Sequence, residues 1–392
     1  MPLPSGVEAP PAWSPTSEDL LALTTAFETA LASGPAPAPA PAERRPVRHR
    51  RVGWWLALGA LLPMFVLLLR TPFQDWLPIG DVGTIALRVA EVGTRHTPLV
   101  GPYSHFGWSH PGPVLFEILA PPYRVFGTGG LLLGALLING VAMWIIATRL
   151  YRAGGVAVAT FGIGCFWATS WSLGLSWVWY PWNPNIAMLP FAALLVLTWT
   201  SARNSRWDLP LLALVASFLA QTHVAYAPFV VALVPIALLG RGRRRAPGLV
   251  PPPKPPRAAR DRAPVFLAIA VLVVAWLPPI VDALVHDGGN LRDLVDFWLT
   301  DHQTLGFGSA FRIVFLELSV RAPWIGFHEP TFLGAVAPRG TPIPIGLFLV
   351  VGAAIAAWRA GDRFALRCAL TVLACIGVAV LSIARIVGFA YP

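Results

Sequence analysis

Nine apolar segments, separated by polar or charged loops, constrain this chain more than any other feature. They lie near residues 53–70, 130–150, 155–177, 186–201, 208–223, 224–240, 264–284, 343–358 and 364–385. Most of them approach the roughly 20 residues that a helix needs to cross a bilayer. The pattern predicts an all-α, polytopic membrane protein with about nine transmembrane helices. Segments 208–223 and 224–240 could instead form one re-entrant unit.

Composition supports this fold class. The 392 residues are 56% hydrophobic and only 12% charged, about half of the roughly 25% charge that a soluble domain carries. These values exclude a soluble enzyme, a disordered chain and a collagen-like repeat. The formal net charge of +10 does not indicate a nucleic acid partner, because no DNA-binding motif is present. In a membrane protein, basic residues mark the cytoplasmic side.

The distribution of the basic residues predicts the orientation. With the N-terminus inside, the cytoplasmic segments are 1–52, 149–154, 202–207, 241–263 and 359–363 with its edge. They hold 20 of the 29 basic residues, whereas every histidine except His49 lies on the opposite side. The positive-inside rule therefore predicts a multi-pass plasma membrane protein with a cytoplasmic N-terminus. Its active face is expected to be extracytoplasmic.

The loops suggest how the chain is organised. Residues 1–52, with a Pro-Ala run and a basic cluster beside the first apolar segment, predict a flexible cytoplasmic arm. Residues 53–392 are expected to form the transmembrane domain, with a basic, Pro-rich cytoplasmic linker at 241–263. The outer loops 71–129 and 285–342 are too long to be plain connectors. They are the candidate functional regions.

The first outer loop contains a short amphipathic helix that opens at Asp81. Its apolar face consists of Val82, Ile85, Val89 and Val92. An Asp at a helix start is often only an N-cap, but the residues that follow favour a functional carboxylate. Glu91, ten residues on, lies close to the same face. It is either a partner acid or, as the simpler alternative, a solvated charge.

Aromatic and basic side chains are concentrated after that helix. They are Arg95, His96, Tyr103, His105, Trp108 and His110. Aromatic faces with imidazole and guanidinium donors suit a sugar and a phosphate. An interfacial aromatic belt would explain Tyr103 and Trp108, but not the density of His and Arg. Zinc is an alternative ligand for the three histidines, although their spacing matches no helical metal motif.

The order of these features resembles the GT-C glycosyltransferases, in particular the branch of protein O-mannosyltransferases and aminoarabinose transferases. A first membrane helix precedes the Asp of the juxtamembrane helix, and His110-Pro111 then leads a second surface helix that ends at Phe126-Gly127. Further similar segments are Trp182-Asn183-Pro184, Gln221-Thr222-His223 and Pro278-Pro279…Gly289-Asn290. Together they cover most of 53–300.

The resemblance implies a GT-C-type helical bundle with extracytoplasmic juxtamembrane helices. It also implies transfer of a sugar from a polyprenyl phosphate donor to an envelope glycan, lipid or protein acceptor. In such enzymes the first-loop Asp is the catalytic base, and Asp81 holds that position here. The chemistry agrees, because an acceptor hydroxyl must lose its proton as it attacks the anomeric carbon.

The leaving phosphate needs Arg or His side chains that neutralise its charge. Arg95, His96 and Arg385 are the candidates, although Arg385, near the outer end of the last helix, could instead snorkel to the interface. Asn183 is also expected to contact substrate. His223 is expected either to line the cavity or to form hydrogen bonds between helices.

One turn departs from the family pattern. Many members carry a second acid between the third and fourth helices, where this chain reads Tyr180-Pro181-Trp182-Asn183-Pro184-Asn185. A two-acid metal site is therefore unsupported, and a divalent metal cofactor stays only an alternative. Many members also continue beyond the ninth helix, so the chain is either a short form or part of a longer one.

The second outer loop adds Asp293, Asp296 and His302 among aromatic residues. The alternation of acids that a calcium loop requires is absent, which favours an amphipathic surface helix with solvated acids. Residues 303–342 are expected to add another interfacial helix. The alternative function is a non-enzymatic transporter or flippase of lipid-linked sugars. Few charges within the helices and no clear inverted repeat make it the weaker prediction.

Overall fold

The structure, a computed structural model, describes residues 46–69, 76–201, 206–240, 262–300, 302–320 and 342–387, together with Glu18 and Thr25. The chain divides into two units, Met1–His49 and Arg50–Pro392, of which the first lies almost entirely outside the described residues. So do most of the predicted arm and almost all of the predicted linker at 241–263.

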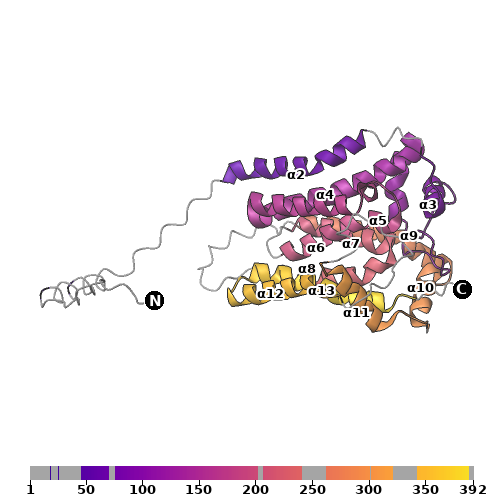
Figure 1. Cartoon of the computed structure of the whole chain (residues 1–392). Helices are drawn as coiled ribbons and strands as arrows, with labels where there is room; N and C mark the ends of the chain where they lie inside the picture. The colour runs from indigo at the N-terminus through magenta and orange to yellow at the C-terminus, as the bar shows by residue number, and fades with distance from the viewer. Residues whose placement is uncertain are drawn as a thin grey trace, which may run out of the picture. The chain divides into compact units, whose positions relative to one another are not determined.

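The described part of the chain is helical and contains no strand, which confirms the predicted all-α class. Seven of the apolar segments each coincide with one helix: α2 (Pro46–Leu68), α6 (Met188–Thr200), α7 (Asp208–Thr222), α8 (Ala227–Gly240), α9 (Ala263–Val285), α12 (Ile345–Arg359) and α13 (Arg363–Ala384). The other two belong to α4 (Val114–Ser172), which is interrupted at Gly127, Gly154 and Gly155. The long helices pack alongside one another (Figure 1).

Among the described residues, three helices are long and apolar enough to cross a membrane, namely α4, α9 and α13. Large apolar side chains of α9, including Phe266, Val274 and Leu277, are more than half exposed. Apolar surface of this extent is favoured in lipid and costly in water. These helices indicate a membrane protein. α2, α7, α8 and α12 contribute shorter apolar helices.

The first part of α4 is the expected second helix of the first outer loop, but it is not peripheral. Leu115, Phe116 and Leu119 are completely buried and pack against α3 (Gly80–Glu91). The helix then reverses at Gly127, where φ is 59°, a value that favours glycine. The predicted surface position was therefore only half right, because one face of this helix belongs to the core.

Two glycines allow the chain to fold back after that reversal. A Cβ atom on Gly130 would lie 2.0 Å from the carbonyl oxygen of Pro122, and one on Gly134 would lie 2.6 Å from Leu119. Small residues four positions apart let two helices approach closely, as in membrane helix pairs. Gly130 and Gly134 have this spacing, so they set the distance between the first two parts of α4.

Substituting Gly130→Ala is expected to lower the thermal unfolding temperature of the purified protein by several degrees. The new methyl group would overlap a backbone oxygen that cannot move independently, and overpacking of this kind costs about 1–3 kcal/mol. Gly164→Ala is the matched control, because a Cβ at this α4 position meets nothing within 4 Å. An unchanged unfolding temperature for Gly130→Ala would contradict the close packing described above.

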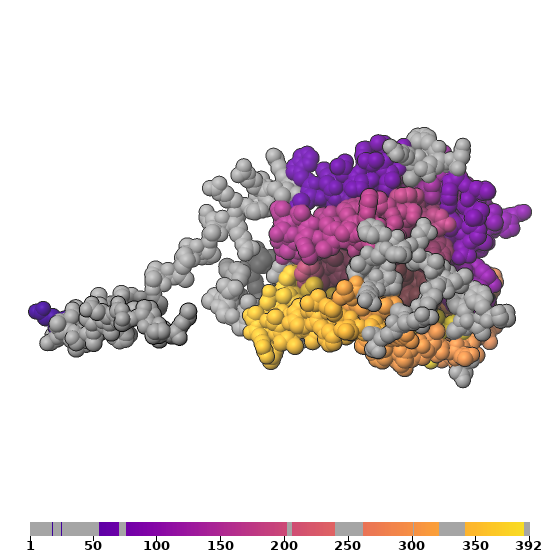
Figure 2. Space-filling view, viewed as in Figure 1, coloured from indigo at the N-terminus to yellow at the C-terminus, as the bar shows by residue number. Residues whose placement is uncertain are grey.

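Three short helices gather at one end of the bundle. α3, α5 (Asn183–Ile186) and α10 (Gly289–Leu299) lie there (Figure 1), and the surface view shows the α3 segment projecting from this end (Figure 2). α10 and α11 (Gly306–Glu317) confirm that the second outer loop forms helices. α11 packs on the last turns of α13 through Ala310 and Val314. Residues 321–341 of this loop lie outside the described part.

Candidate functional site

Asp81 is in the first turn of α3, and its side chain is exposed. The N-cap of α3 is Ile79, without a side-chain cap, so the carboxylate does not serve as the helix cap considered above. Trp182 Nε1 donates a hydrogen bond to Asp81 Oδ2 at 3.0 Å. In the described part of the chain, this indole is the only side chain that hydrogen-bonds to the carboxylate.

The turn at 180–185 therefore lies against the start of α3. The ring of Tyr180 contacts that of Trp76 edge to face, with centroids 5.9 Å apart, and Trp182 follows two residues later. At the turn where the family pattern would supply a second acid, this chain supplies an N–H donor to the first. Trp182 was recognised as part of a similar segment but was not predicted as a site residue, because its partner is 101 positions away.

His110 and His223 form a second group of candidate residues. Residues 101–110 make a tight hairpin, with Gly101 N bonded to His110 O at 2.9 Å, and His110 is buried on its returning arm. Its ring lies 4.6 Å from that of His223, centroid to centroid. Val224 N, in the turn that joins α7 to α8, donates to His110 Nδ1 at 3.1 Å. The first outer loop is thus docked on this turn.

Burial lowers the pKa of His110 to about 3, with a further contribution from His223, and lowers the pKa of His223 to about 4. Both residues lie outside the helices, and they face Trp108, Tyr226 and each other. The ordinary value is near 6.5. Below pH 6.5 the unfolded chain therefore binds protons that the folded protein does not, and acid favours unfolding.

The thermal unfolding temperature is accordingly expected to stay level above pH 7 and to fall steadily between pH 6.5 and pH 4. A protein with both His110→Gln and His223→Gln should show a much smaller fall of the unfolding temperature with pH, because the two titrating groups are gone. Thermal unfolding of both proteins in detergent across this range measures the effect. An equal fall of the unfolding temperature in the wild type and the double variant would show that other groups cause the acid sensitivity.

Asn290 holds the second outer loop to the first. Its Oδ1 accepts from Ser109 N at 2.6 Å, and its Nδ2 donates to Ser109 O at 2.8 Å. Asp282 Oδ2 accepts from Asn290 N at 2.9 Å, which fixes the start of α10. Trp108 also packs on Phe297 of α10. From the sequence, Gly289-Asn290 stood out only as part of the family resemblance. No local pattern indicates that Asn290 bonds to Ser109, 181 positions away.

Asn183 lies beside these groups but below the surface. Its side chain is only 6% exposed, and Nδ2 donates to Thr222 O at 3.3 Å. The amide therefore connects α5 to the end of α7, next to His223. A contact between Asn183 and substrate stays a prediction.

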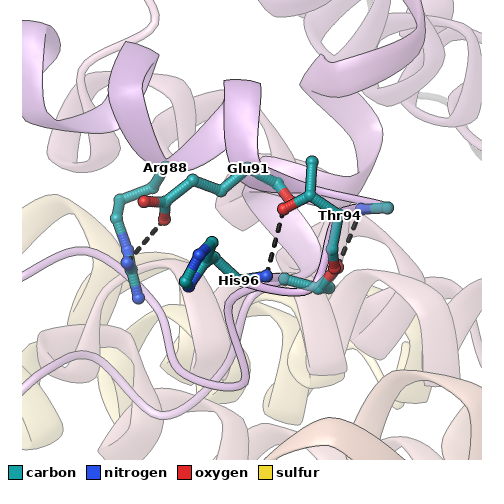
Figure 3. A network of polar contacts seen from close by, with 6 residues as sticks. Arg88, Glu91, Thr94 and His96 are labelled. Carbon is teal, nitrogen blue, oxygen red and sulfur yellow. Dashed lines mark hydrogen bonds and ion pairs between the residues drawn. The ribbon is translucent and has the colours of Figure 1, made fainter.

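The predicted residues at the far end of α3 form a separate group. Arg88 and Glu91 form an ion pair at 2.6 Å (Figure 3). Arg95 Nε donates to His96 Nε2 at 3.0 Å. Glu91 is ten residues from Asp81, or about 15 Å along a helix, so the structure gives Glu91 a basic partner and does not place it beside the first acid.

Arg385 lies near the C-terminal end of α10. Its Nη2 donates to Trp298 O at 3.2 Å, and it lines a cavity of about 80 Å³ with His302, Thr304 and neighbours. Arg385 thus anchors the end of α10. Its side chain is also exposed to solvent. Tyr103 and His105 are exposed in the 101–110 hairpin, whereas Trp108 is buried.

The described residues contain no group of three or more His, Cys, Asp or Glu side chains placed to hold a metal ion. The histidines considered for zinc are in different environments, since His110 is buried and His96 is exposed. In the second loop, Arg292 approaches Asp287 and Asp296 at 3.5 and 3.8 Å. His302 instead packs on the ring of Phe297.

Comparison with known proteins finds no match to this chain among family models, curated proteins or solved structures.

Proposed function

We propose that this chain is an integral membrane glycosyltransferase of GT-C type. It would transfer a sugar from a polyprenyl phosphate donor to an envelope glycan, lipid or protein acceptor. The observation that carries the proposal is the Asp81 carboxylate, which is exposed, does not cap its helix and is held by the Trp182 indole. Aromatic and imidazole groups of the kind that bind sugars and phosphates belong to the same end of the bundle.

The proposed topology has nine transmembrane helices, a cytoplasmic N-terminus and an extracytoplasmic active face in the plasma membrane. It is supported by the match between the nine apolar segments and the helices. The clustering of α3, α5 and α10 at one end of the bundle also supports this topology (Figure 1). The positive-inside rule assigns the loops that contain these three helices to the outer side.

In the proposed reaction, an acceptor hydroxyl attacks the anomeric carbon of the donor. The new oxygen–carbon bond forms as the bond from the anomeric carbon to the phosphate oxygen breaks, and polyprenyl phosphate leaves with the electron pair. Asp81 takes the hydroxyl proton. Trp182 donates to Oδ2, and no hydrogen bond within the described part of the chain involves Oδ1 of Asp81, so Oδ1 can accept that proton.

Purified protein in liposomes, supplied with a panel of labelled polyprenyl phosphate sugars and an envelope extract, tests the proposal. Transfer of label to an acceptor, with release of polyprenyl phosphate, is the expected result. Failure with every donor would argue against an enzyme.

One observation favours the transporter alternative. Arg149 and Asp208 form a buried ion pair between α4 and α7, near the helix ends that the proposed topology assigns to the cytoplasmic side. Buried ionisable pairs between membrane helices mark candidate transport paths. The same liposomes distinguish the two functions. A transporter would move the labelled lipid between leaflets and leave the bond between sugar and phosphate intact.

A further inference from the structure

The hydrogen bonds around His110 and His223 define the position of the proton on each ring. Val224 N donates to His110 Nδ1 at 3.1 Å, and Ala225 N donates to His223 Nδ1 at 3.3 Å. A backbone N–H can only donate, so each Nδ1 must be unprotonated. The neutral rings therefore carry their protons on Nε2.

Both Nε2–H groups are available to a ligand. The Nδ1 edges of both rings face the same turn at Val224 and Ala225, so the Nε2 edges face away from it. In the described part of the chain, neither Nε2 has a hydrogen-bond partner, and Trp108 Nε1, on the ring that contacts His110, is buried without one. Polar groups below the surface are normally satisfied, so this cluster has donors in excess of acceptors.

The tautomers also indicate which ligand would fit. A metal ion binds a ring nitrogen through its lone pair, but in these tautomers Nε2 carries a proton instead. A ligand that offers oxygen acceptors suits them, and the two rings, 4.6 Å apart from centroid to centroid, offer one donor each to the two non-bridging oxygens of a phosphodiester. Because burial keeps both imidazoles neutral near pH 7, they would hold such an anion without forming an ion pair.

We infer that His110 and His223 together bind the phosphodiester of a lipid-linked sugar through their two Nε2–H groups. The identity of the lipid rests on the proposed function, whereas the donor pair rests on the hydrogen bonds alone. The inference moves the phosphate away from Arg95 and His96, which lie beyond the far end of α3. It brings the phosphate to the α7–α8 turn, which Asn183 connects to the α5 region beside Trp182 and Asp81.

Substitution by Asn or by Gln distinguishes the role of Nδ1 from that of Nε2 in each ring. Asn places its amide near the Nδ1 position, so Asn at 110 or 223 can still accept the backbone N–H but presents no donor at the Nε2 position. Gln reaches the Nε2 position and keeps a donor there. A hydrogen bond to a charged group contributes about 1.5–3 kcal/mol, which corresponds to roughly tenfold to more than a hundredfold in affinity.

Binding of a labelled short-chain polyprenyl phosphate sugar, which carries the phosphodiester, to the full-length protein in phosphatidylcholine nanodiscs tests the inference. His110→Asn and His223→Asn should each weaken binding at least tenfold while the unfolding temperature at pH 7.5 stays near that of wild type. The two Gln variants should bind within about threefold of wild type. His286→Asn, a change at an exposed histidine that pairs with Asp282, should have no effect.

Competitors identify the source of the phosphate. The unlabelled polyprenyl phosphate sugar should displace the probe, whereas polyprenol, inorganic phosphate and phosphatidylglycerol should not. Equal displacement by inorganic phosphate or phosphatidylglycerol would overturn the assignment to a lipid-linked sugar, and wild-type affinity in both Asn variants would overturn the donor pair itself. Histidine-dependent binding without any sugar transfer would instead reject the proposed function and leave this site standing.

Discussion

Asp81→Asn is expected to lower the initial rate of sugar transfer by about 10²- to 10⁴-fold, the range that a general base contributes. The substitution removes the basic oxygen but keeps an oxygen that can accept the hydrogen bond from Trp182 Nε1. Position and fold should therefore be preserved while the proton acceptor is lost. Initial rates in liposomes, with the donor that the wild-type protein uses, measure the effect.

Asp287→Asn provides a matched control for this experiment. Asp287 is an exposed acid at the start of the second outer loop, and its backbone has a φ of 50°, which Asn tolerates well. The same change of carboxylate to amide there should leave transfer within about threefold of wild type. If Asp81→Asn retained a comparable rate, Asp81 would not be the base, and the proposed mechanism would have to be abandoned.

Hydropathy predicted the helices well because an apolar run is a local property, which can be seen in consecutive residues of the sequence. Every apolar segment coincides with a helix, and the interruptions of α4 fall at glycines that its sequence shows. The candidate site was predicted less completely. Asp81, His110 and His223 were identified, but the contacts that organise them, from Trp182 and Asn290, join residues more than 100 positions apart. No local periodicity specifies such pairs.

Charge counting has a similar limit. The positive-inside count assigned the basic residues of 149–154 and of 359–363 with its edge to the cytoplasmic side. Two of them, Arg149 and Arg367, are not freely solvated charges. Arg367 donates to Thr198 O at 3.3 Å and to Ile236 O at 2.7 Å, and so connects α13 to α6 and α8. A sequence shows how many basic residues a loop contains. It does not show which of them turn inward to satisfy a helix end or a buried acid.

The buried pair of Arg149 and Asp208 gives the second large expected effect. Their side chains are 5% and 1% exposed, so removing either partner leaves an uncompensated charge in the bundle. Arg149→Leu or Asp208→Leu alone is expected to cost about 3–5 kcal/mol, whereas the double variant should recover most of this loss. Chemical unfolding in detergent of the three variants and the wild type measures the coupling.

The ion pair of Arg88 and Glu91 is the control for these Arg149 and Asp208 variants, because its side chains are 43% and 37% exposed. Exposed pairs contribute about 0–1 kcal/mol, so Arg88→Leu should change stability little. A small effect at Arg149 as well would mean that water reaches the buried pair. If the stable double variant still transfers sugar, the pair serves the fold. If that variant instead loses only movement of the labelled lipid between leaflets, the pair belongs to a transport path, and the transporter alternative becomes the better account of the chain.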